Sequence, residues 1–369
     1  MHVPTSVPIE IRPDHTVRIK IIDSCGMACT FCHNEGTPVT VDNLKATPGA
    51  YVGTPGKTGR VSIYLKTNGA QFLAAPVEPG ADFAMSLAAL RGTISTKEVH
   101  FTGGEPTLHP RLPGLVAQAH RMGLTVGVTS NGESGRAVME ECAKAGLDRI
   151  NLSVFGTTPE ELAAVQADRV ASVQVAAKKI ESLDATVEQA LSHGVKVSAN
   201  IVVVDKTHVP RVLRLIDRYG KDVVIRMLTN LETDSESKEA IDEVLSRVGA
   251  RPVRRIVTAG ASGYRVRYRT PDGGTLYVKL IGSVRLPETC SRCRFNNDQD
   301  CHEGYYGVRL YRTIQGEYMV GVCIQRMDLC IPLHEFVMSD LRSEVQNFRD
   351  DEMARLSSEH AHDLATAAR

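Results

Sequence analysis

A short apolar strand runs directly into three cysteines in the stretch VRIKIIDSCGMACTFC, residues 17–32. Cys25, Cys29 and Cys32 form the pattern C-x3-C-x2-C, so three of the chain's nine cysteines fall within eight positions. Cysteines clustered on one loop indicate a metal site, and a tight triplet of thiolates suits a cubane iron–sulfur cluster. Structural zinc usually takes four ligands from two separated pairs. Because His33 could supply a fourth ligand here, a zinc site stays an alternative.

The length and charge of the chain limit the kinds of protein it can be. Its 369 residues can form one large α/β domain with a smaller appendage, or two ordinary domains. Lys and Arg number 43, as do Asp and Glu, so neither nucleic acid nor an anionic membrane is an expected partner. The N-terminus lacks a signal-peptide pattern, and no apolar run reaches the roughly 18 residues of a membrane span. A cytoplasmic location with reduced thiols is therefore predicted.

Short apolar strands alternate with helix-like stretches from residue 17 onward. The predicted strands are residues 17–22, 98–102, 124–130, 149–156, 195–204 and 223–228. Two of the helical patterns between them, residues 136–146 and 185–194, end at a glycine. This rhythm predicts parallel strands with right-handed crossovers, and six such units form a partial (β/α)6 TIM barrel. Ligands then lie at the carboxyl ends of the strands.

Further motifs follow the cysteine triplet in chain order. Phe31 precedes the last cysteine, FTGGEP (101–106) follows the second strand, SNG (130–132) ends the third, NLSVFG (151–156) forms the fourth, and Arg226 lies in the sixth. With these motifs the sequence resembles the radical S-adenosylmethionine (SAM) superfamily over roughly residues 15 to 230. The resemblance implies that the triplet binds a [4Fe–4S] cluster whose remaining iron chelates SAM. An electron from that cluster would cleave SAM to a 5′-deoxyadenosyl radical, which abstracts a hydrogen atom from the substrate.

The same resemblance assigns cofactor-binding residues. They are Phe31, Gly103, Gly104, Glu105, Ser130, Asn131, Ser153, Asn200 and Arg226. Gly103, Gly104 and Glu105 would offer backbone groups to the methionine ammonium, since glycine permits a close approach. Arg226 suits a carboxylate because its guanidinium carries a fork of donors. For Ser153 and Asn200, ordinary hydrogen bonding at a strand end is an equally good interpretation.

Five more cysteines gather after the α/β rhythm ends. They are Cys290, Cys293, Cys301, Cys323 and Cys330. A zinc ribbon is one interpretation of this group. The segment also resembles the C-terminal part of the radical SAM GTP cyclase of molybdenum-cofactor synthesis, and the shortened auxiliary-cluster domains known as twitch or SPASM-type domains. The resemblance implies a second, auxiliary [4Fe–4S] cluster on Cys290, Cys293 and Cys323, with Cys301 preferred over Cys330 as fourth ligand. It also makes Arg309 a substrate-contact candidate, for which an ordinary surface arginine is an equally good interpretation.

Some features separate this sequence from that cyclase. The spacing between the second group's cysteines is longer, and the chain ends without a Gly-Gly pair. An insertion at about residues 37–97 contains a predicted hairpin at 59–76, which is either a substrate lid or a decoration. Within the insertion, GTPGKTG (53–59) resembles a phosphate loop but lacks the spacing and the preceding strand of a Walker A motif.

A second predicted hairpin lies around Asp272-Gly273, in residues 264–282. It places Arg265, Arg267 and Arg269 on one face of its first strand. That face is either solvated or binds a phosphate or carboxylate. The remaining cysteine, Cys142, lies alone in a helical segment and is predicted to be a buried apolar residue.

These patterns predict four segments. Residues 1–230 form the barrel, 231–285 a connecting helix and hairpin, 286–338 a small C-terminal auxiliary-cluster domain, and 339–369 a helical tail. Only 16 residues precede the first predicted strand, so a leader-peptide-binding domain is not expected and a small-molecule substrate is favoured. The leading hypothesis is an antibiotic-biosynthesis lyase or oxidoreductase that dehydrates, deoxygenates or dehydrogenates an aminosugar, aminocyclitol or sugar nucleoside. The alternatives are a GTP cyclase-like rearrangement, a peptide-modifying enzyme and a non-catalytic metal-binding protein.

Such an enzyme needs groups that move a proton near the clusters. The candidates are His33, Glu35, Glu232, His302 and Glu303, and of these Glu35 and Glu232 are favoured because they follow strand ends. The expected partners are a small-molecule substrate and an electron donor such as flavodoxin or ferredoxin.

Overall fold

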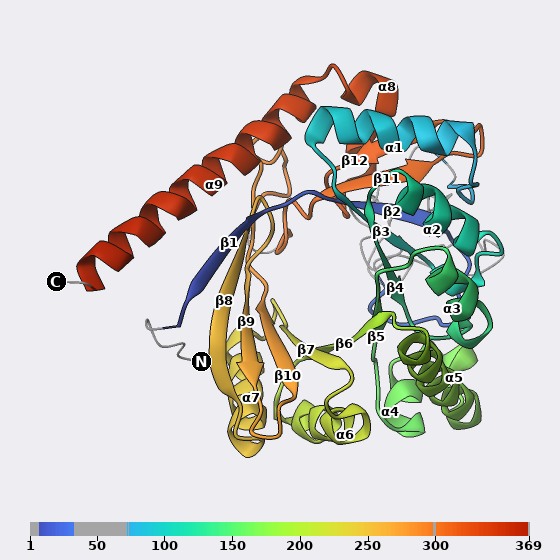
Figure 1. The fold of residues 1–369 in the computed structure, drawn as a ribbon, viewed down its shortest axis with the longest axis vertical. Coiled ribbons are helices and arrows are strands. Elements are labelled where there is room, and N and C mark those ends of the chain that lie inside the picture. Colours follow the sequence, from blue (N-terminus) through green and yellow to red (C-terminus); the bar gives the residue numbers. More distant parts are fainter. Residues whose placement is uncertain (1–6, 33–71, 73, 298–299, 368–369) are drawn as a thin grey trace. The chain divides into compact units, whose positions relative to one another are not determined.

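The computed structural model describes residues 7–32, 72, 74–297 and 300–367 (Figure 1). The chain divides into two compact units. Unit 1 comprises Met1–Asp14, Ser198–Gly307 and Ser339–Arg369, and unit 2 comprises His15–Val197 and Val308–Met338. Neither unit coincides with one of the four predicted segments, whose boundaries stay a prediction. Among the described helices, none has both the length and the apolar character needed to cross a membrane.

Unit 2 contains a sheet with the strand order β5-β4-β3-β2-β11-β12-β13. Its strands are β2 (Thr16–Ile22), β3 (Glu98–Gly103), β4 (Thr125–Ser130), β5 (Arg149–Ser153), β11 (Val308–Arg312), β12 (Tyr318–Gly321) and β13 (Ile331–Pro332). Strands β2 to β5 pair in parallel, as their sequence rhythm predicts, and β11 joins the free edge of β2 in parallel. Strand β11 therefore lies beside the cysteine-bearing strand β2.

Crossover helices connect the parallel strands of unit 2. They are α1 (Ala81–Ile94), α2 (Leu112–Arg121), α3 (Gly135–Lys144), α4 (Pro159–Ala164) and α5 (Val173–Ser192), and the short α8 (Leu333–Phe336) follows β13. Figure 1 shows α1, α2, α3 and α5 along the outer side of strands β2 to β5. The two glycines that end predicted helices, Gly146 and Gly194, have φ of 98° and 75°, as helix C-termini favour.

The core of unit 2 is formed by apolar side chains that recur at helical spacing in the helices and at alternate positions in the strands. In α1, Phe83, Leu87, Leu90 and Ile94 recur at helical spacing and are buried. The ring of Phe83 lies 6.3 Å from that of Phe101 on β3. Cys142 in α3 is fully buried, and burial raises the pKa of its thiol to about 12, so the prediction of an inert apolar role is confirmed.

Unit 1 contains strands in the order β1-β8-β9-β10-β7-β6. They are β1 (Ile9–Pro13), β6 (Lys196–Val203), β7 (Val224–Thr229), β8 (Arg251–Ala259), β9 (Tyr264–Arg269) and β10 (Thr275–Leu280). β6 and β7 pair in parallel, and β9 and β10 form the predicted antiparallel hairpin. The α/β class with the parallel strands of a partial barrel is thus confirmed.

Two strands of unit 1, β1 and β8, were not predicted. β1 lies within the first 16 residues and pairs in parallel with β8, so the expectation that strands begin at residue 17 was wrong. β1 is short and only half-buried, and its sequence, IEIRP, contains no apolar run. β8 carries a proline and three arginines, which weaken any strand pattern.

The helices of unit 1 are α6 (Val209–Tyr219), α7 (Asp234–Arg247) and α9 (Asp340–Ala367). The predicted helical tail is confirmed as α9. It is held within unit 1 because Arg349 forms an ion pair of 3.5 Å with Asp14, and the ring of Phe348 lies 5.9 Å from that of Tyr305.

Candidate functional site

The cysteine loop that follows β2 lies against the segment that follows α4. Thr30 N–H donates to Val165 O at 3.0 Å, and Ala167 N–H donates to Ala28 O at 2.9 Å. Met27 is buried in an apolar cluster with Leu162, Ala163 and Ala176, against which Cys25 and Cys29 pack. The loop is therefore held both by backbone hydrogen bonds and by the burial of Met27.

Three N–H donors point at the cysteine sulfurs. Met27 N–H and Asn131 Nδ2 lie 3.4 and 3.5 Å from Cys25 Sγ, and Gln166 Nε2 lies 3.3 Å from Cys29 Sγ. Donors aimed at sulfur stabilise a thiolate, which is the form that ligates a metal. This arrangement fits the iron–sulfur ligands expected from the sequence.

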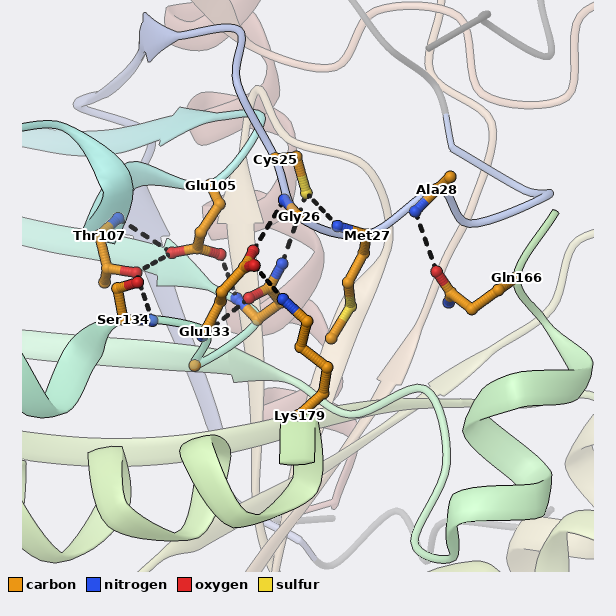
Figure 2. Close-up of polar contacts among 12 residues, drawn as sticks. Cys25, Gly26, Met27, Ala28, Glu105, Thr107, Glu133, Ser134, Gln166 and Lys179 are labelled. Atoms are coloured by element: carbon orange, nitrogen blue, oxygen red, sulfur yellow. Dashed lines mark hydrogen bonds and ion pairs between the residues drawn. The ribbon is translucent and has the colours of Figure 1, made fainter. Parts of the chain in front are cut away.

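Gln166 is a residue that sequence reasoning missed. Its side chain is buried, and its Oε1 accepts from Ala28 N–H at 2.9 Å (Figure 2). Its Nε2 lies 3.3 Å from Cys29 Sγ. No motif marks this glutamine, because it comes within reach of the loop only through the packing of α4.

Glu133 and Lys179 were also missed. Glu133 accepts from Gly26 N–H at 2.8 Å and forms an ion pair with Lys179 of α5, as Figure 2 shows. A Cβ on Gly26 would lie 1.6 Å from Glu133 Oε1, so glycine lets the carboxylate approach the loop. The ion pair thus ties the residue next to Cys25 to the helix layer.

The two glycines of FTGGEP lie against the backbone that leads into the cysteine loop. Gly104 N–H donates to Ile22 O at 2.7 Å, and Glu105 N–H donates to Ser24 O at 2.8 Å. A Cβ on Gly103 would lie 2.3 Å from Ile22 O, and one on Gly104 would lie 2.2 Å from Ser24 O. The structure therefore supplies a packing reason for both glycines, beside the predicted approach to a cofactor.

The Glu105 carboxylate is fully buried and joins the ends of β3 and β4. Its Oε1 accepts from Thr107 N–H at 2.9 Å, Thr107 Oγ1 at 2.6 Å and Ser130 Oγ at 2.6 Å, and its Oε2 accepts from Asn131 N–H at 2.6 Å. Burial raises the pKa of Glu105, while these hydrogen bonds act in the opposite direction. The side chains of Glu105 and Ser130 thus bond to each other and hold Asn131 in place.

The remaining predicted cofactor residues lie in strands or, for Phe31, in the cysteine loop. Ser153 ends β5 half-buried, and the exposed ring of Phe31 packs edge-on against Phe155 at 5.1 Å. In unit 1, Asn200 of β6 lies opposite Arg226 of β7 in register. The structure thus brings together the residues of the cysteine loop, FTGGEP and SNG, whose cofactor-binding roles stay predictions.

The predicted proton-transfer residues differ in where they lie and in how buried they are. His33 and Glu35 lie outside the described residues, as do most of the predicted 59–76 hairpin and all of GTPGKTG. Glu232 is exposed after β7, and its N–H bonds to Asn230 Oδ1. Glu303 is half-buried in unit 1, and its Oε2 is buried without a hydrogen-bond partner within the described part of the chain. His302 beside it is half-buried.

Three cysteines of the second group gather in unit 1. Cys293 N–H donates to Cys290 O at 3.0 Å, and Leu286 N–H lies 3.2 Å from Cys290 Sγ. Burial raises the pKa of Cys290, and the neighbouring Cys301 and Cys293 raise it further. Cys293 and Cys301 thus lie near enough to Cys290 to act on the charge of its thiol.

Cys323 and Cys330 belong to unit 2. Cys323 Sγ lies 3.4 Å from Arg326 N–H, and Cys330 lies over β12, where a Cβ on Gly321 would be 2.8 Å from its sulfur. All nine cysteines are among the described residues, and none is in a disulfide. In the described ranges no three His, Cys, Asp or Glu side chains form a group that could hold a metal ion.

Comparison with known proteins agrees with the arrangement of the cysteine loop, FTGGEP and SNG described above. The radical SAM superfamily matches residues 19–218, more than half of the chain. A probable GTP 3',8-cyclase of Thermoplasma volcanium is 24% identical over 335 residues, which cover 86% of this chain and 82% of the relative. The GTP 3',8-cyclase of Staphylococcus haemolyticus is 22% identical over 321 residues, which cover 83% and 81%.

Among solved structures, Streptococcus suis SuiB has a TM-score of 0.51 at 12% identity, over 90% of this chain and 65% of that protein. This is a likeness of fold alone. The family match includes the cysteine loop, FTGGEP and SNG, whose residues the structure brings together. The chain therefore belongs to the radical SAM superfamily.

Proposed function

We propose that this chain is a radical SAM enzyme that abstracts a hydrogen atom from a phosphorylated nucleoside such as GTP. Family membership implies a [4Fe–4S] cluster and SAM, and Cys25, Cys29 and Cys32 would hold the cluster. Bound there, these groups supply the electron and the 5′-deoxyadenosyl radical for hydrogen abstraction. The observation that carries the proposal is the set of N–H donors aimed at Cys25 and Cys29, because it suits thiolate ligands.

The surrounding residues would keep this loop in one geometry. Gln166 orients Cys29, and the Glu133–Lys179 ion pair holds Gly26. The Glu105 carboxylate accepts from the backbone N–H of Asn131 and so holds Asn131 against Cys25. Such supporting contacts orient ligands and tune a cluster's electronics. We assign Arg226 and Asn200 to the SAM carboxylate, since they face the same way on adjacent strands.

The proposed substrate class rests on the names of the similar proteins and on two positively charged arginine side chains. The relatives described above are named GTP 3',8-cyclases, and none of them supports an aminosugar or aminocyclitol substrate. Arg309 of β11 is buried and lies opposite Arg18 of β2 in register. Guanidinium groups suit phosphate through their fork of donors. A nucleotide is therefore favoured over the unphosphorylated substrate of the leading sequence hypothesis.

A second iron–sulfur cluster is part of the proposal. The grouping of Cys290, Cys293 and Cys301 supports Cys301 over Cys330 as an additional ligand, and Cys323 stays a predicted one. A Cys301→Ser variant should lose the iron and sulfide of one cluster, while Cys330→Ser should keep both. Equal loss in the two variants would contradict this assignment. The electron donor, flavodoxin or ferredoxin, and the cytoplasmic location stay predictions.

The test is SAM cleavage after anaerobic reconstitution with iron and sulfide. The protein is incubated with SAM and dithionite, alone, with GTP, and with aminosugars and sugar nucleosides, and 5′-deoxyadenosine is quantified by mass spectrometry. Stimulation by GTP in the wild type, absent in a Cys25/Cys29/Cys32→Ala variant, is the expected result. Stimulation by an unphosphorylated sugar would favour the earlier hypothesis, and no product from fully loaded protein would refute the enzyme assignment.

A further inference from the structure

One closed loop of unit 1 carries three cysteines of the second group. At its base, Val284 N–H donates to Glu303 O at 3.1 Å, and Tyr305 N–H donates to Val284 O at 2.8 Å. Between these two ends the chain carries Cys290, Cys293 and Cys301. Hydrogen bonds of the backbone therefore close this segment, residues 284–305, which we call the second cysteine loop.

Arg285 joins the start of the second cysteine loop to its later residues. Its Nε donates to Asn296 Oδ1 at 2.6 Å, and its Nη2 donates to Cys301 O. A Cβ on Gly304 would lie 2.2 Å from Arg285 Nη1, so glycine makes room for the guanidinium. The backbone at Cys301 is thus tied to the part of the loop that leads into Cys290.

Cys290 and Cys293 lie on a helical turn. Cys290 N–H donates to Leu286 O at 3.1 Å, and Arg292 N–H donates to Glu288 O at 3.3 Å. Bonds between residues four apart are the pattern of an α-helix. The direction in which the two cysteines point therefore depends on how this turn is held.

The first N–H groups of a helical turn find no acceptor within it. Here Leu286 N–H lies 3.2 Å from Cys290 Sγ, and Pro287 has no N–H to donate. The donors that remain are the N–H groups of Glu288 and Thr289. An acceptor that reaches both would complete the hydrogen bonding of the turn.

Glu344 of α9 supplies that acceptor. Its Oε1 accepts from Glu288 N–H at 2.6 Å and from Thr289 N–H at 2.9 Å, and its Oε2 accepts from Thr289 Oγ1 at 2.5 Å. Glu344 lies 56 and 55 positions further along the chain than these two residues. The contact therefore exists only because α9 packs beside the second cysteine loop within unit 1.

α9 is itself anchored one turn after Glu344. The ring of Phe348 lies 5.9 Å from that of Tyr305, edge to face, at the base of the second cysteine loop. The neighbouring Arg349 forms its ion pair of 3.5 Å with Asp14, and both side chains are largely buried. The helix thus contacts the loop at its base and at its cysteine-bearing turn, so the Glu344 carboxylate is held in place.

We propose that Glu344 is a positioning residue for the second iron–sulfur cluster, because it fixes the turn from which Cys290 and Cys293 would bind iron. This inference rests on the second cluster of the proposed function and adds the residue that prepares the loop for it. The Leu286 N–H beside Cys290 Sγ suits a thiolate, the form that ligates iron. Removing a residue that supports metal ligands typically lowers metal affinity by about 10- to 100-fold.

The test measures how firmly the second cluster holds its iron in the full-length chain. All proteins carry Cys25/Cys29/Cys32→Ala, so the first cluster cannot form and the iron reports the second cluster alone. After anaerobic reconstitution with iron and sulfide, each protein is titrated with the chelator EDTA, and the iron that remains bound is quantified.

Two variants and one control are compared with this parent protein. Glu344→Ala removes the acceptor. Glu344→Gln keeps an oxygen that accepts from both N–H groups, and its amide nitrogen can donate to the Thr289 hydroxyl. The matched control is Glu359→Ala, because Glu359 is exposed on the same helix and accepts from Arg355 of that helix at 2.8 Å.

Glu344→Ala should lose half of its iron at an EDTA concentration roughly 10- to 100-fold lower than the parent protein does. Glu344→Gln should recover most of this loss, and Glu359→Ala should match the parent protein. With the first three cysteines intact, Glu344→Ala should still cleave SAM at the wild-type rate, which a misfolded protein would not do.

Other outcomes would overturn the proposal. Equal iron retention in Glu344→Ala and the parent protein would show that the carboxylate does not position the ligands. A loss that Glu344→Gln does not relieve, or that Glu359→Ala shares, would show a general effect on the helix. A parent protein that takes up no iron would refute the second cluster and this inference with it, whereas SAM cleavage by the wild type would leave the radical enzyme standing.

Discussion

Replacing Gly104 with alanine tests how the cysteine loop is held. The new Cβ would lie 2.2 Å from Ser24 O and 2.3 Å from Asp23 O, whereas real contacts of this kind are essentially never closer than 3.0 Å. Both obstacles are backbone atoms, so the loop must move by about 1 Å to relieve this overpacking. That movement would stretch the hydrogen bonds from Gly104 to Ile22 and from Glu105 to Ser24, now 2.7 and 2.8 Å, beyond useful length.

The expected loss in the free energy of unfolding can be summed from these changes. Overpacking typically costs about 1–3 kcal/mol, and each lost backbone hydrogen bond about 1 kcal/mol. The smaller entropy of unfolded alanine returns about 0.4–1 kcal/mol. The free energy of unfolding should therefore fall by about 3 kcal/mol, and the iron content of the reconstituted protein should fall with it.

The assay is urea unfolding of the protein without its clusters, followed by iron analysis after reconstitution. Gly92→Ala is the matched control, because Gly92 lies within α1 with open space around its Cβ position and should become slightly more stable. If Gly104→Ala without clusters is as stable as wild type, the glycine serves only the approach of the cofactor and the packing argument fails.

Three further changes test other contacts. Gln166→Leu removes the donor to Cys29 Sγ, so the cluster should become harder to reduce while iron content is largely kept; an unchanged potential in an EPR-monitored redox titration would contradict this role. Glu105→Gln turns an amide donor toward Asn131 N–H and should lower the free energy of unfolding, measured in urea, by about 2–3 kcal/mol. A variant as stable as the wild type would refute this. The pKa of Cys142 rises from 9.0 to about 12 on folding, so the folded protein holds this proton more tightly than the unfolded chain. Stability should thus fall as pH rises above 9, by about 1.4 kcal/mol at pH 10 relative to Cys142→Ala, and parallel pH profiles of the two proteins would rule this out.

The functional site also shows why some of its residues escaped sequence analysis. Cys25, Cys29 and Cys32 are recognisable because their spacing is local and their chemistry is specific. Gln166, Glu133 and Lys179 have ordinary chemistry and lie far along the chain from the residues they hold. Their roles exist only after α4 and α5 have packed beside the cysteine loop.

Apolar periodicity and turn residues predict the strands β2 to β7, the hairpin around Asp272-Gly273 and the helical tail, because these signals act within a few positions. Tertiary structure alone decided that β11 pairs with β2 and that β1 pairs with β8. It also decided that Arg226, Arg265, Arg267 and Lys279 share one face of unit 1. Such pairings depend on register between distant segments, which periodicity within one segment does not encode.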